Sequence, residues 1–264
     1  MNEIKGFLID LDGVIVKGKS FEIFEDAITF FNILKKNYIP FKIATNNSRI
    51  PPEEIASKLN KQGIKIKEKD IVSPLSIAPT VLKENEVSSL FVIGEESLKE
   101  FLKSKKFKIL ENQNVDAVLI GQDRTLNFEK IKIATTAIKR HGAKLYALNN
   151  NLLSQDDDKL LFPGVGSVAK MFVYACSLKE FEHFGKNSKL YNRYIFNELS
   201  LPLDRLAIVS DDLYTDLLGY KKHGLKTIFV TTGKYKISDI TSKELEPDFI
   251  FNNLTELMEN LGLK

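Results

Sequence analysis

Residues 7–16 read FLIDLDGVIV, an apolar run that contains two aspartates, Asp10 and Asp12. Short apolar runs rich in Ile, Val and Phe are typical of buried strands, so we expect a strand over 6–11. Two carboxylates side by side raise each other's pKa unless a positive charge lies near them. Gly13 lets the backbone turn away directly after them. The stretch therefore predicts a buried strand that presents two acidic groups where it ends.

Similar apolar runs recur along the chain and alternate with segments of helical spacing. The predicted helices carry start and stop signals such as Pro or Glu in the first turn and Gly after the last. Strands that alternate with helices predict an α/β fold with a parallel sheet. The alternation occurs three times, which allows a second α/β unit inserted within the first. Further strands are expected at 40–45, 90–94, 117–121, 144–148, 206–210 and 226–230, and helices at 24–37, 51–63, 128–142, 190–200 and 212–224.

The composition is that of an ordinary globular protein, with 264 residues, 43% hydrophobic and 28% charged, and a net charge of +3 at pH 7. The lysines are scattered among glutamates, which argues against a nucleic-acid partner. The sequence has no apolar stretch of about 18 residues, and its first residues lack the basic start and the cleavage site of a signal peptide, so we expect neither a membrane span nor a signal peptide. Cys176 is the single cysteine, so an internal disulfide and a cysteine-based metal site are excluded. We therefore expect a cytoplasmic protein.

Polar side chains directly follow three of the predicted strands. Asp12 follows the first strand, TNNS (45–48) follows the second, and SDD (210–212) ends a later one. Gly185 and Lys186 precede a predicted helix. In open parallel sheets, ligands bind at the carboxyl ends of the strands. The sequence therefore predicts that these groups converge on one site.

The acidic residues of this set indicate a metal. Asp10 and Asp12 are two positions apart, so on an extended chain they point the same way. Asp211 ends another predicted strand and can approach the pair. Three converging carboxylates favour a hard cation, most simply Mg²⁺ with part of its water shell retained. The cation would also keep one carboxylate ionised and nucleophilic.

The same residues also allow structural interpretations. D-x-D-G is compatible with a plain strand-ending turn, TNNS with a turn or a cap, and Asp211-Asp212 with the N-cap of the helix that follows. A calcium-binding loop is excluded, because its sixth position would be Ile15 instead of Gly and its twelfth Phe21 instead of Glu.

Other motifs give weaker indications. GVGSVA (164–169) matches the dinucleotide pattern G-x-G-x-x-[GA], but Pro163 precedes it instead of a strand, so a dinucleotide enzyme is a minor alternative. His183 is close to Lys186 in the sequence and is a candidate for lining a site. QDDDK (155–159) is expected to be a solvated loop.

Taken in order, DLDG (10–13), TNNS (45–48), GK (185–186) and SDDLYTD (210–216) resemble the four motifs of the haloacid dehalogenase superfamily of phosphotransferases. Those motifs are an apolar strand with D-x-D-G, a strand-ending Thr or Ser, an isolated Lys, and a strand-ending acidic motif with a further Asp. The match spans essentially the whole chain. The resemblance implies a Rossmann-like parallel-sheet core domain.

Further stretches narrow the resemblance to one branch. TNNS, with VIGEESL (92–98), FPGVGSVAKMF (162–172) and FGKNS (184–188), is similar to the p-nitrophenyl phosphatase and pyridoxal phosphatase branch. That branch carries a large α/β cap of the C2 type between the second and third motifs. The resemblance implies a catalytic core over 1–79 and 184–264 and an inserted cap, which sets substrate specificity, over 80–183. A homodimer formed through the cap is one arrangement that it allows.

The resemblance also implies roles for the acidic residues. Asp10 would be the nucleophile that attacks phosphorus to give an aspartyl-phosphate. Asp12 would protonate the leaving group and then activate the hydrolytic water. Asp10, Asp211 and the backbone carbonyl of Asp12 would hold Mg²⁺. Asp216, with Asp212 one turn before it, would support these groups without binding the metal.

The second and third motifs would bind the transferring phosphoryl group. Thr45 and the amide of Asn46 would contact its oxygens, with Asn47 beside them, and Lys186 would offset the negative charge. This division fits phosphoryl transfer, which needs mostly positioning and cationic stabilisation. A halide leaves without a proton, so the acid/base carboxylate of Asp12 favours an alcohol-like leaving group over dehalogenation.

The chain departs from the branch pattern at three places. Ser210 stands where Gly is usual, Asn187 where Pro is common, and Asn150-Asn151 where Pro-Asp is usual. The third departure lies near the expected meeting of cap and substrate, so the substrate's identity does not transfer.

These observations predict a Mg²⁺-dependent phosphatase acting on a small phosphomonoester metabolite, such as a sugar phosphate, a nucleotide, phosphoglycolate or pyridoxal phosphate. Two alternatives stay open: a non-catalytic phosphometabolite-binding protein on the same scaffold, and a phosphotransferase with an alcohol acceptor. A large cap would close over the site and exclude bulky protein substrates.

Overall fold

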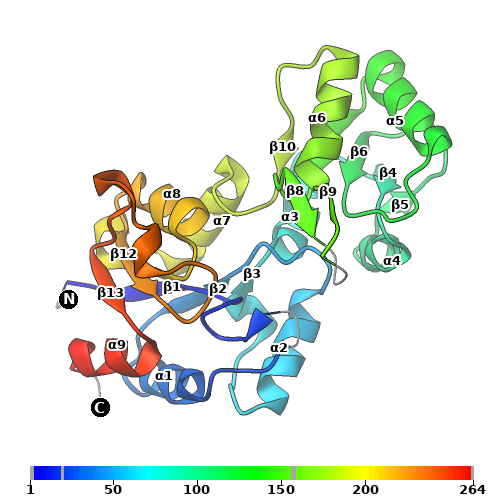
Figure 1. Ribbon diagram of the computed structural model, residues 1–264. Helices are drawn as coiled ribbons and strands as arrows, with labels where there is room; N and C mark the ends of the chain where they lie inside the picture. Colours follow the sequence, from blue (N-terminus) through cyan, green and yellow to red (C-terminus); the bar gives the residue numbers. More distant parts are fainter. Residues whose placement is uncertain (1–2, 19–20, 156–158, 263–264) are drawn as a thin grey trace. The chain divides into compact units, whose positions relative to one another are not determined.

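The computed structural model describes residues 3–18, 21–155 and 159–262 (Figure 1). They form two compact units, each with its own parallel sheet. The first unit comprises the chain up to Thr45, Pro52–Val72 and the chain from Asn192 onward, and the second comprises 46–51 and Ser73–Tyr191. The predicted α/β class with an inserted α/β domain is confirmed. Most of the predicted loop QDDDK lies outside the described residues.

The sheet of the first unit has the strand order β13-β12-β11-β1-β2-β3, and its neighbouring strands are parallel. Its strands are β1 (Gly6–Asp10), β2 (Phe41–Ala44), β3 (Ile71–Val72), β11 (Leu206–Ser210), β12 (Lys226–Val230) and β13 (Phe249–Phe251). Its helices are α1 (Glu25–Lys36), α2 (Pro52–Lys61), α8 (Leu218–Lys221) and α9 (Leu254–Leu261), and α7 (Lys189–Leu199) begins in the second unit and ends in the first.

Helix α1 covers β1 and β2 through an aromatic core. Phe30 meets Phe7 of β1 edge to face at 6.0 Å, and Phe31 meets Phe41 of β2 at 5.1 Å. These phenylalanines follow from the helical spacing of the apolar residues in α1, which places them on one face. The four residues of β1 before Asp10 are almost completely buried. The core therefore fixes the strand that carries Asp10.

The second unit holds a separate parallel sheet with the order β10-β7-β6-β4-β5. Its strands are β4 (Ser89–Ile93), β5 (Lys108–Ile109), β6 (Ala117–Ile120), β7 (Lys144–Ala147) and β10 (Glu182–His183), and β8 (Leu153–Gln155) pairs with β9 (Leu161–Pro163) as an antiparallel hairpin. Its helices are α3 (Pro74–Glu84), α4 (Glu96–Ser104), α5 (Phe128–His141) and α6 (Val165–Cys176).

Helices α5 and α6 pack on this second sheet. Val118 and Ile120 of β6 share a core cluster with Ala137 of α5 and with Phe172 and Cys176 of α6. Cys176, the single cysteine, is buried there. No helix among the described residues has both the length and the apolarity that a membrane crossing requires.

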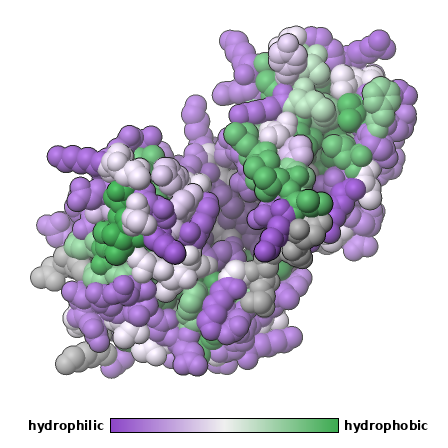
Figure 2. Space-filling model, in the orientation of Figure 1, coloured by the Kyte–Doolittle hydropathy of each residue, from purple (hydrophilic) through white to green (hydrophobic). Residues whose placement is uncertain are grey.

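The β8–β9 hairpin of the second unit is unusually apolar on its surface. Figure 2 shows hydrophobic side chains gathered over this hairpin. No strand was expected here, because a run of three residues is too short for a periodic signal. A homodimer through the cap stays a prediction. The exposed leucines of the hairpin and its flanks are Leu152, Leu153, Leu160 and Leu161.

The predicted limits of core and cap likewise stay predictions. Helix α3 begins at Pro74, inside the stretch that was expected in the core, and belongs to the second compact unit.

Candidate active site

The strand order of the first sheet creates a switch point between β1 and β11. The chain leaves β1 toward β2 on one side, and it leaves β11 toward β12 on the other. Ligands bind where the direction of winding reverses at the carboxyl ends of the strands. Asp10 is the last residue of β1, and Asp211 directly follows β11. Ile9 and Val209 are partners in the ladder, so both aspartates reach the same edge.

A cavity of about 590 Å³ opens at this edge within the first unit. It is the place where Asp10, Asp12, Asp211 and Asp212 come together. Asp10 and Asp211 are only 7% and 5% exposed, whereas Asp12 is exposed. The other lining residues are Gly13, Lys17, Gly18, Phe24, Thr232, Gly233 and Lys234.

Buried hydrogen bonds hold the carboxylate of Asp10. Its Oδ1 accepts the N–H of Leu11 at 2.7 Å. Its Oδ2 lies 3.3 Å from the hydroxyl of Ser210, which also lies 2.8 Å from the Asp216 carboxylate and accepts the N–H of Asp212. Asp216 is 2% exposed and lies on a π-helical turn, Leu213–Leu217. Asp216 is thus linked to Asp10 through Ser210, one of the residues that depart from the family pattern.

Asp212 has a structural role that the sequence allowed as an alternative. Its Oδ1 accepts the N–H groups of Tyr214 and Thr215 and so caps the π-helical turn. Its Oδ2 lies 3.0 Å from Nζ of Lys234. Burial lowers the pKa of Lys234, but the contacts with Asp212 and Tyr235 outweigh burial and keep that pKa above its usual value. The continuous helix expected over 212–224 is wrong: the π-helical turn is followed by the short α8.

Asp211 lies in a cradle formed by two loops. Its Oδ2 accepts the N–H of Lys234 at 2.5 Å. A Cβ atom on Gly13 or on Gly233 would overlap the Asp211 carboxylate, so only glycine, which has no side chain, fits at either position. Gly13 also has φ +79°, a backbone conformation that other residues rarely adopt.

Residues 232–234, in the loop after β12, are a part of the site that sequence reasoning missed. Thr232, Gly233 and Lys234 line the cavity, as do Lys17 and Phe24 after β1. The sequence did contain a usable signal: TTGK directly follows the predicted strand 226–230. The rule that ligands bind at the carboxyl ends of strands, applied to this strand too, points to the loop.

Thr45 lies at the neighbouring strand end. Ala44, the last residue of β2, pairs with Asp10 in the ladder, and Thr45 follows it directly. The side chain of Thr45 is completely buried, and its N–H donates to the carbonyl of Val72. Thr45 is therefore next to the strand end that carries Asp10.

Asn46, Asn47 and Lys186 belong to the second compact unit. Oδ1 of Asn46 accepts the backbone N–H of Lys186 at 2.7 Å, so the second and third motifs meet there. Asn47 accepts the N–H groups of Arg49 and Ile50 and stabilises a local turn. The approach of these residues to the carboxylates of the first unit stays a prediction.

The donor set of the cavity fits a hard cation in part. Among the described residues, no group of three or more His, Cys, Asp or Glu side chains is arranged to hold a metal ion. Asp10, Asp12 and Asp211 do line one cavity, and their binding of a metal stays a prediction. Asp10 and Asp211 offer two carboxylates with oxygen-only chemistry, which suits Mg²⁺ when a carbonyl and waters complete the shell. Gly13 and Gly233, which form the cradle, place no side chain beside the Asp211 carboxylate.

The two other departures from the family pattern have structural counterparts. Asn187 has φ +65°, which proline cannot adopt but asparagine tolerates. Asn150 and Asn151 pack against the turn that begins α6, where the N–H of Gly166 donates to the carbonyl of Asn151 at 2.9 Å. Asn150-Asn151, near the expected meeting of cap and substrate, therefore lies against the start of α6 within the second unit.

The minor motifs do not form a dinucleotide site. GVGSVA opens α6, and Pro163 is the last residue of β9, so a strand does precede it, contrary to the expectation. That strand belongs to an antiparallel hairpin, whereas the dinucleotide motif requires a parallel βαβ unit. His183 lies half-buried on β10 beside the ring of Phe181, and burial lowers its pKa.

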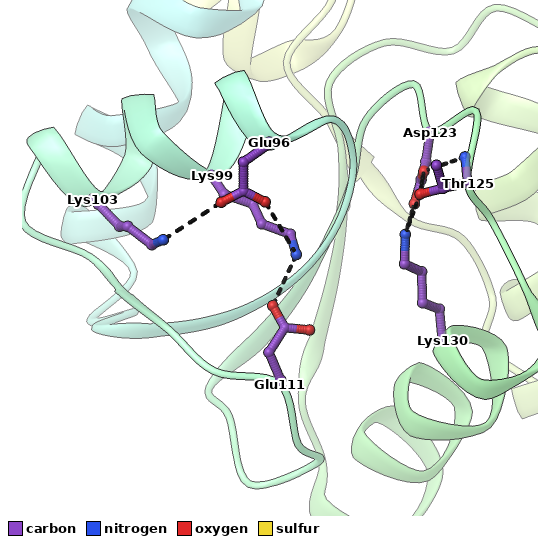
Figure 3. Close-up of polar contacts among 7 residues, drawn as sticks. All are labelled: Glu96, Lys99, Lys103, Glu111, Asp123, Thr125 and Lys130. Carbon is purple, nitrogen blue, oxygen red and sulfur yellow. Dashed lines mark hydrogen bonds and ion pairs between the residues drawn. The ribbon is translucent and has the colours of Figure 1, made fainter.

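The carboxyl edge of the second sheet carries charged side chains that are paired with one another (Figure 3). After β6, Asp123 contacts Nζ of Lys130 at 2.7 Å and the hydroxyl of Thr125 at 2.8 Å. After β4, Lys99 contacts Glu111 at 2.8 Å and Glu96 at 3.8 Å. These pairs are explained by the local structure of the unit.

Comparisons with known proteins agree with this geometry. The family model of haloacid dehalogenase-like hydrolases matches residues 7–108, and a model described as HAD-hydrolase-like matches residues 183–257. The acid sugar phosphatase of Staphylococcus epidermidis (strain ATCC 12228) is 30% identical over 262 residues, which is 99% of each chain.

Two solved structures match this chain over nearly its whole length. The p-nitrophenyl phosphatase of Archaeoglobus fulgidus is 25% identical with a TM-score of 0.85, covering 97% of this chain and 99% of that one. The 4-nitrophenylphosphatase of Thermotoga maritima is 27% identical with a TM-score of 0.84, covering 98% and 97%. The chain therefore belongs to the haloacid dehalogenase-like hydrolases, as a phosphatase of the p-nitrophenyl phosphatase branch with a C2-type cap.

Proposed function

We propose that the protein is a Mg²⁺-dependent phosphatase that hydrolyses a small phosphomonoester through an aspartyl-phosphate on Asp10. The observation that carries the proposal is the meeting of Asp10 and Asp211 in one cavity at the switch point of the first sheet. Both carboxylates are nearly buried, and buried carboxylates favour a bound cation, since like charges otherwise raise each other's pKa.

Asp10 is the nucleophile in this proposal. Its Oδ atom attacks phosphorus, the bond to the leaving oxygen breaks, and a phosphoryl group is carried on the carboxylate. Its contact with Leu11 N–H holds one oxygen, so the carboxylate has a defined orientation before attack. Asp10, Asp211 and the carbonyl of Asp12 would hold Mg²⁺, which when bound neutralises charge on the phosphoryl oxygens.

Asp12 moves the protons. Its exposed side chain lines the same cavity as Asp10, where it donates a proton to the leaving oxygen and then takes one from the attacking water. Thr45 and the amide of Asn46 would bind phosphoryl oxygens, with Asn47 beside them, and Lys186 would balance their charge, as the family resemblance implies. The hydroxyl of Ser210 contacts both Asp216 and Asp10, so Asp216 helps to hold Asp10 in place through Ser210.

A sugar phosphate is the proposed substrate class. The support is the name of the staphylococcal relatives, which are acid sugar phosphatases, at about 30% identity across the whole chain. Nucleotides, phosphoglycolate and pyridoxal phosphate are the competing classes in a metabolite screen. The cytoplasmic location and the lack of a nucleic-acid partner remain predictions.

The test is hydrolysis of p-nitrophenyl phosphate with Mg²⁺, with EDTA, and by the Asp10→Asn variant. Asparagine keeps the shape of the side chain but removes the anionic nucleophile, so turnover should fall by about 10³-fold or more. Asp204→Asn, an exposed surface change, is the matched control and should leave turnover unchanged. Full activity of pure Asp10→Asn protein would contradict the assignment of the nucleophile.

Two further comparisons separate the alternatives. A phosphotransferase would transfer the phosphoryl group to an added alcohol, so the yield of phosphorylated alcohol would rise at the expense of inorganic phosphate. A non-catalytic binding protein would bind a sugar phosphate but release no phosphate from it, whether Mg²⁺ is present or not.

A further inference from the structure

The loop after β12 contacts both elements that are expected to hold the metal. The hydroxyl of Thr232 donates to the carbonyl of Gly13 at 2.5 Å, and the N–H of Lys234 donates to Oδ2 of Asp211, also at 2.5 Å. Gly233, between them, approaches Gly13 so closely that a Cβ on Gly233 would lie 2.8 Å from the Cα of Gly13. The loop is thus packed tightly against the turn that follows β1.

These contacts fix the turn that contains the Asp12 carbonyl. The C=O of Asp12 and the N–H of Gly13 belong to the same peptide group. This N–H donates to the carbonyl of Val16 at 2.8 Å. A peptide group is planar, so fixing its N–H fixes the direction of its C=O. The hydroxyl of Thr232 donates to the carbonyl of Gly13, so the N–H and the C=O of Gly13 are both restrained by hydrogen bonds.

Gly13 needs such a restraint, because its backbone lies in the left-handed region at φ +79° and glycine has many accessible conformations. A flexible turn would lower the affinity of a cation that depends on one of its carbonyls, since the ordering of the turn would oppose binding. The hydrogen bond from Thr232 removes part of that freedom before the cation arrives.

We propose that Thr232 is a positioning residue for the metal: its hydroxyl orients the Asp12–Gly13 turn, while the neighbouring N–H of Lys234 orients the Asp211 carboxylate. This inference rests on the proposed function, because it assumes that Asp10, Asp211 and the Asp12 carbonyl hold a cation. It adds a residue outside the four motifs to the machinery of the site.

The chain supplies a matched control one residue away. Thr231 is also half-buried, but its hydroxyl contacts the carbonyl of Asn252 at 3.5 Å, on β13's side of the loop and not on the Asp12–Gly13 turn. Thr231→Val and Thr232→Val make the same chemical change at adjacent positions. Thr232→Ser keeps the hydroxyl and removes only a methyl group.

The experiment is a titration of each full-length variant with Mn²⁺, a paramagnetic substitute for Mg²⁺, with free Mn²⁺ followed by electron paramagnetic resonance. Loss of a group that orients a metal ligand typically costs 10–100-fold in metal affinity. We expect Thr232→Val to bind Mn²⁺ about tenfold more weakly than the wild type, or about 1.4 kcal/mol. Thr231→Val and Thr232→Ser should bind like the wild type.

Equal Mn²⁺ affinity of Thr232→Val and the wild type would overturn the inference, as would an equal loss in Thr231→Val. If Thr232→Val does not fold, Thr232→Ser decides: wild-type affinity supports the role of the hydroxyl, and a tenfold loss contradicts it. If the wild type itself binds no Mn²⁺, the metal site fails along with the inference. If the wild type binds Mn²⁺ and hydrolyses p-nitrophenyl phosphate, but Thr232→Val binds Mn²⁺ equally well, only the positioning role is refuted.

Discussion

The hydroxyl of Ser210 lies between two carboxylates, 2.8 Å from that of Asp216 and 3.3 Å from that of Asp10. A hydroxyl has one proton, so it donates to one of these carboxylates at a time, and the shorter contact favours Asp216. The N–H of Asp212 donates to the hydroxyl oxygen from the other side. Ser210, one of the departures from the family pattern, therefore lies at the centre of a buried polar network.

Removal of this hydroxyl should impair turnover more than substrate binding. Ser210→Ala removes a charged hydrogen bond to the buried Asp216 carboxylate, worth about 1.5–3 kcal/mol. It also removes the group 3.3 Å from the Asp10 carboxylate that helps to hold that carboxylate in place. We expect kcat for p-nitrophenyl phosphate to fall about tenfold, with KM nearly unchanged. Ser104→Ala, which removes a hydroxyl bonded only to its own helix at Phe101, is the control. An effect on KM alone would contradict the proposed link to Asp10.

Much of this site could be predicted from the sequence, because the signals are local. The predicted strand at 6–11 is β1, and the runs at 206–210 and 226–230 are β11 and β12. Asp10, Asp12 and Asp211 line one cavity because each lies at or just after the carboxyl end of a strand. Parallel sheets collect such strand ends at one edge, so order along the chain is enough to predict their convergence.

The remaining features depend on contacts between residues distant in sequence. The bond from Thr232 to Gly13 joins positions 219 residues apart, and no local pattern encodes it. Short strands such as β3 and β10 have two residues each, too few for a periodic signal. The π-helical turn that carries Asp216 was expected as regular helix, because its apolar spacing alone does not distinguish the two.

Asn187 should tolerate glycine but not the proline that is common in the family. Its φ of +65° is outside the range of proline, which is fixed near −65°. We expect Asn187→Pro to lower the free energy of unfolding by about 3 kcal/mol or more, and Asn187→Gly to change it by less than about 1 kcal/mol. Urea unfolding of the full chain measures both. A fully stable Asn187→Pro protein would mean that this turn adopts another backbone conformation.

The Asp123–Lys130 pair should matter far more to stability than nearby surface pairs (Figure 3). The Asp123 side chain is 2% exposed and that of Lys130 is 20% exposed. Burial raises the pKa of Asp123, but Lys130 and Thr125 outweigh it and keep that pKa below its usual value. Lys130→Met would leave a buried carboxylate without its cation, which costs about 3 kcal/mol or more.

Lys103→Met is the matched control, because Lys103 pairs with Glu96 at 3.6 Å on the surface, where such pairs contribute about 0–1 kcal/mol. Urea unfolding of the two variants should therefore differ clearly. Similar losses of stability in both would show that the Asp123 carboxylate finds another partner or becomes protonated.

Asp116 should make the stability of the second unit depend on pH in acid. Hydrogen bonds from the backbone and side chains of Ser88 and Ser89 lower the pKa of Asp116 to about 2. Because the folded-state pKa is below that of the unfolded chain, the ionised carboxylate stabilises the fold above the unfolded pKa. That contribution is lost as the pH falls through the folded pKa.

The melting temperature of the wild type should therefore exceed that of Asp116→Asn near neutral pH, and the difference should shrink as the pH falls from about 4 toward about 2. Asparagine cannot gain or lose the charge that the serine contacts stabilise, so it serves as the protonation-insensitive reference. Glu100→Gln, an exposed change on α4, controls for a general effect of losing one negative charge. A difference between wild type and Asp116→Asn that stays constant over this range would mean that the carboxylate's charge plays no part in holding β4 and β6 together at their starts.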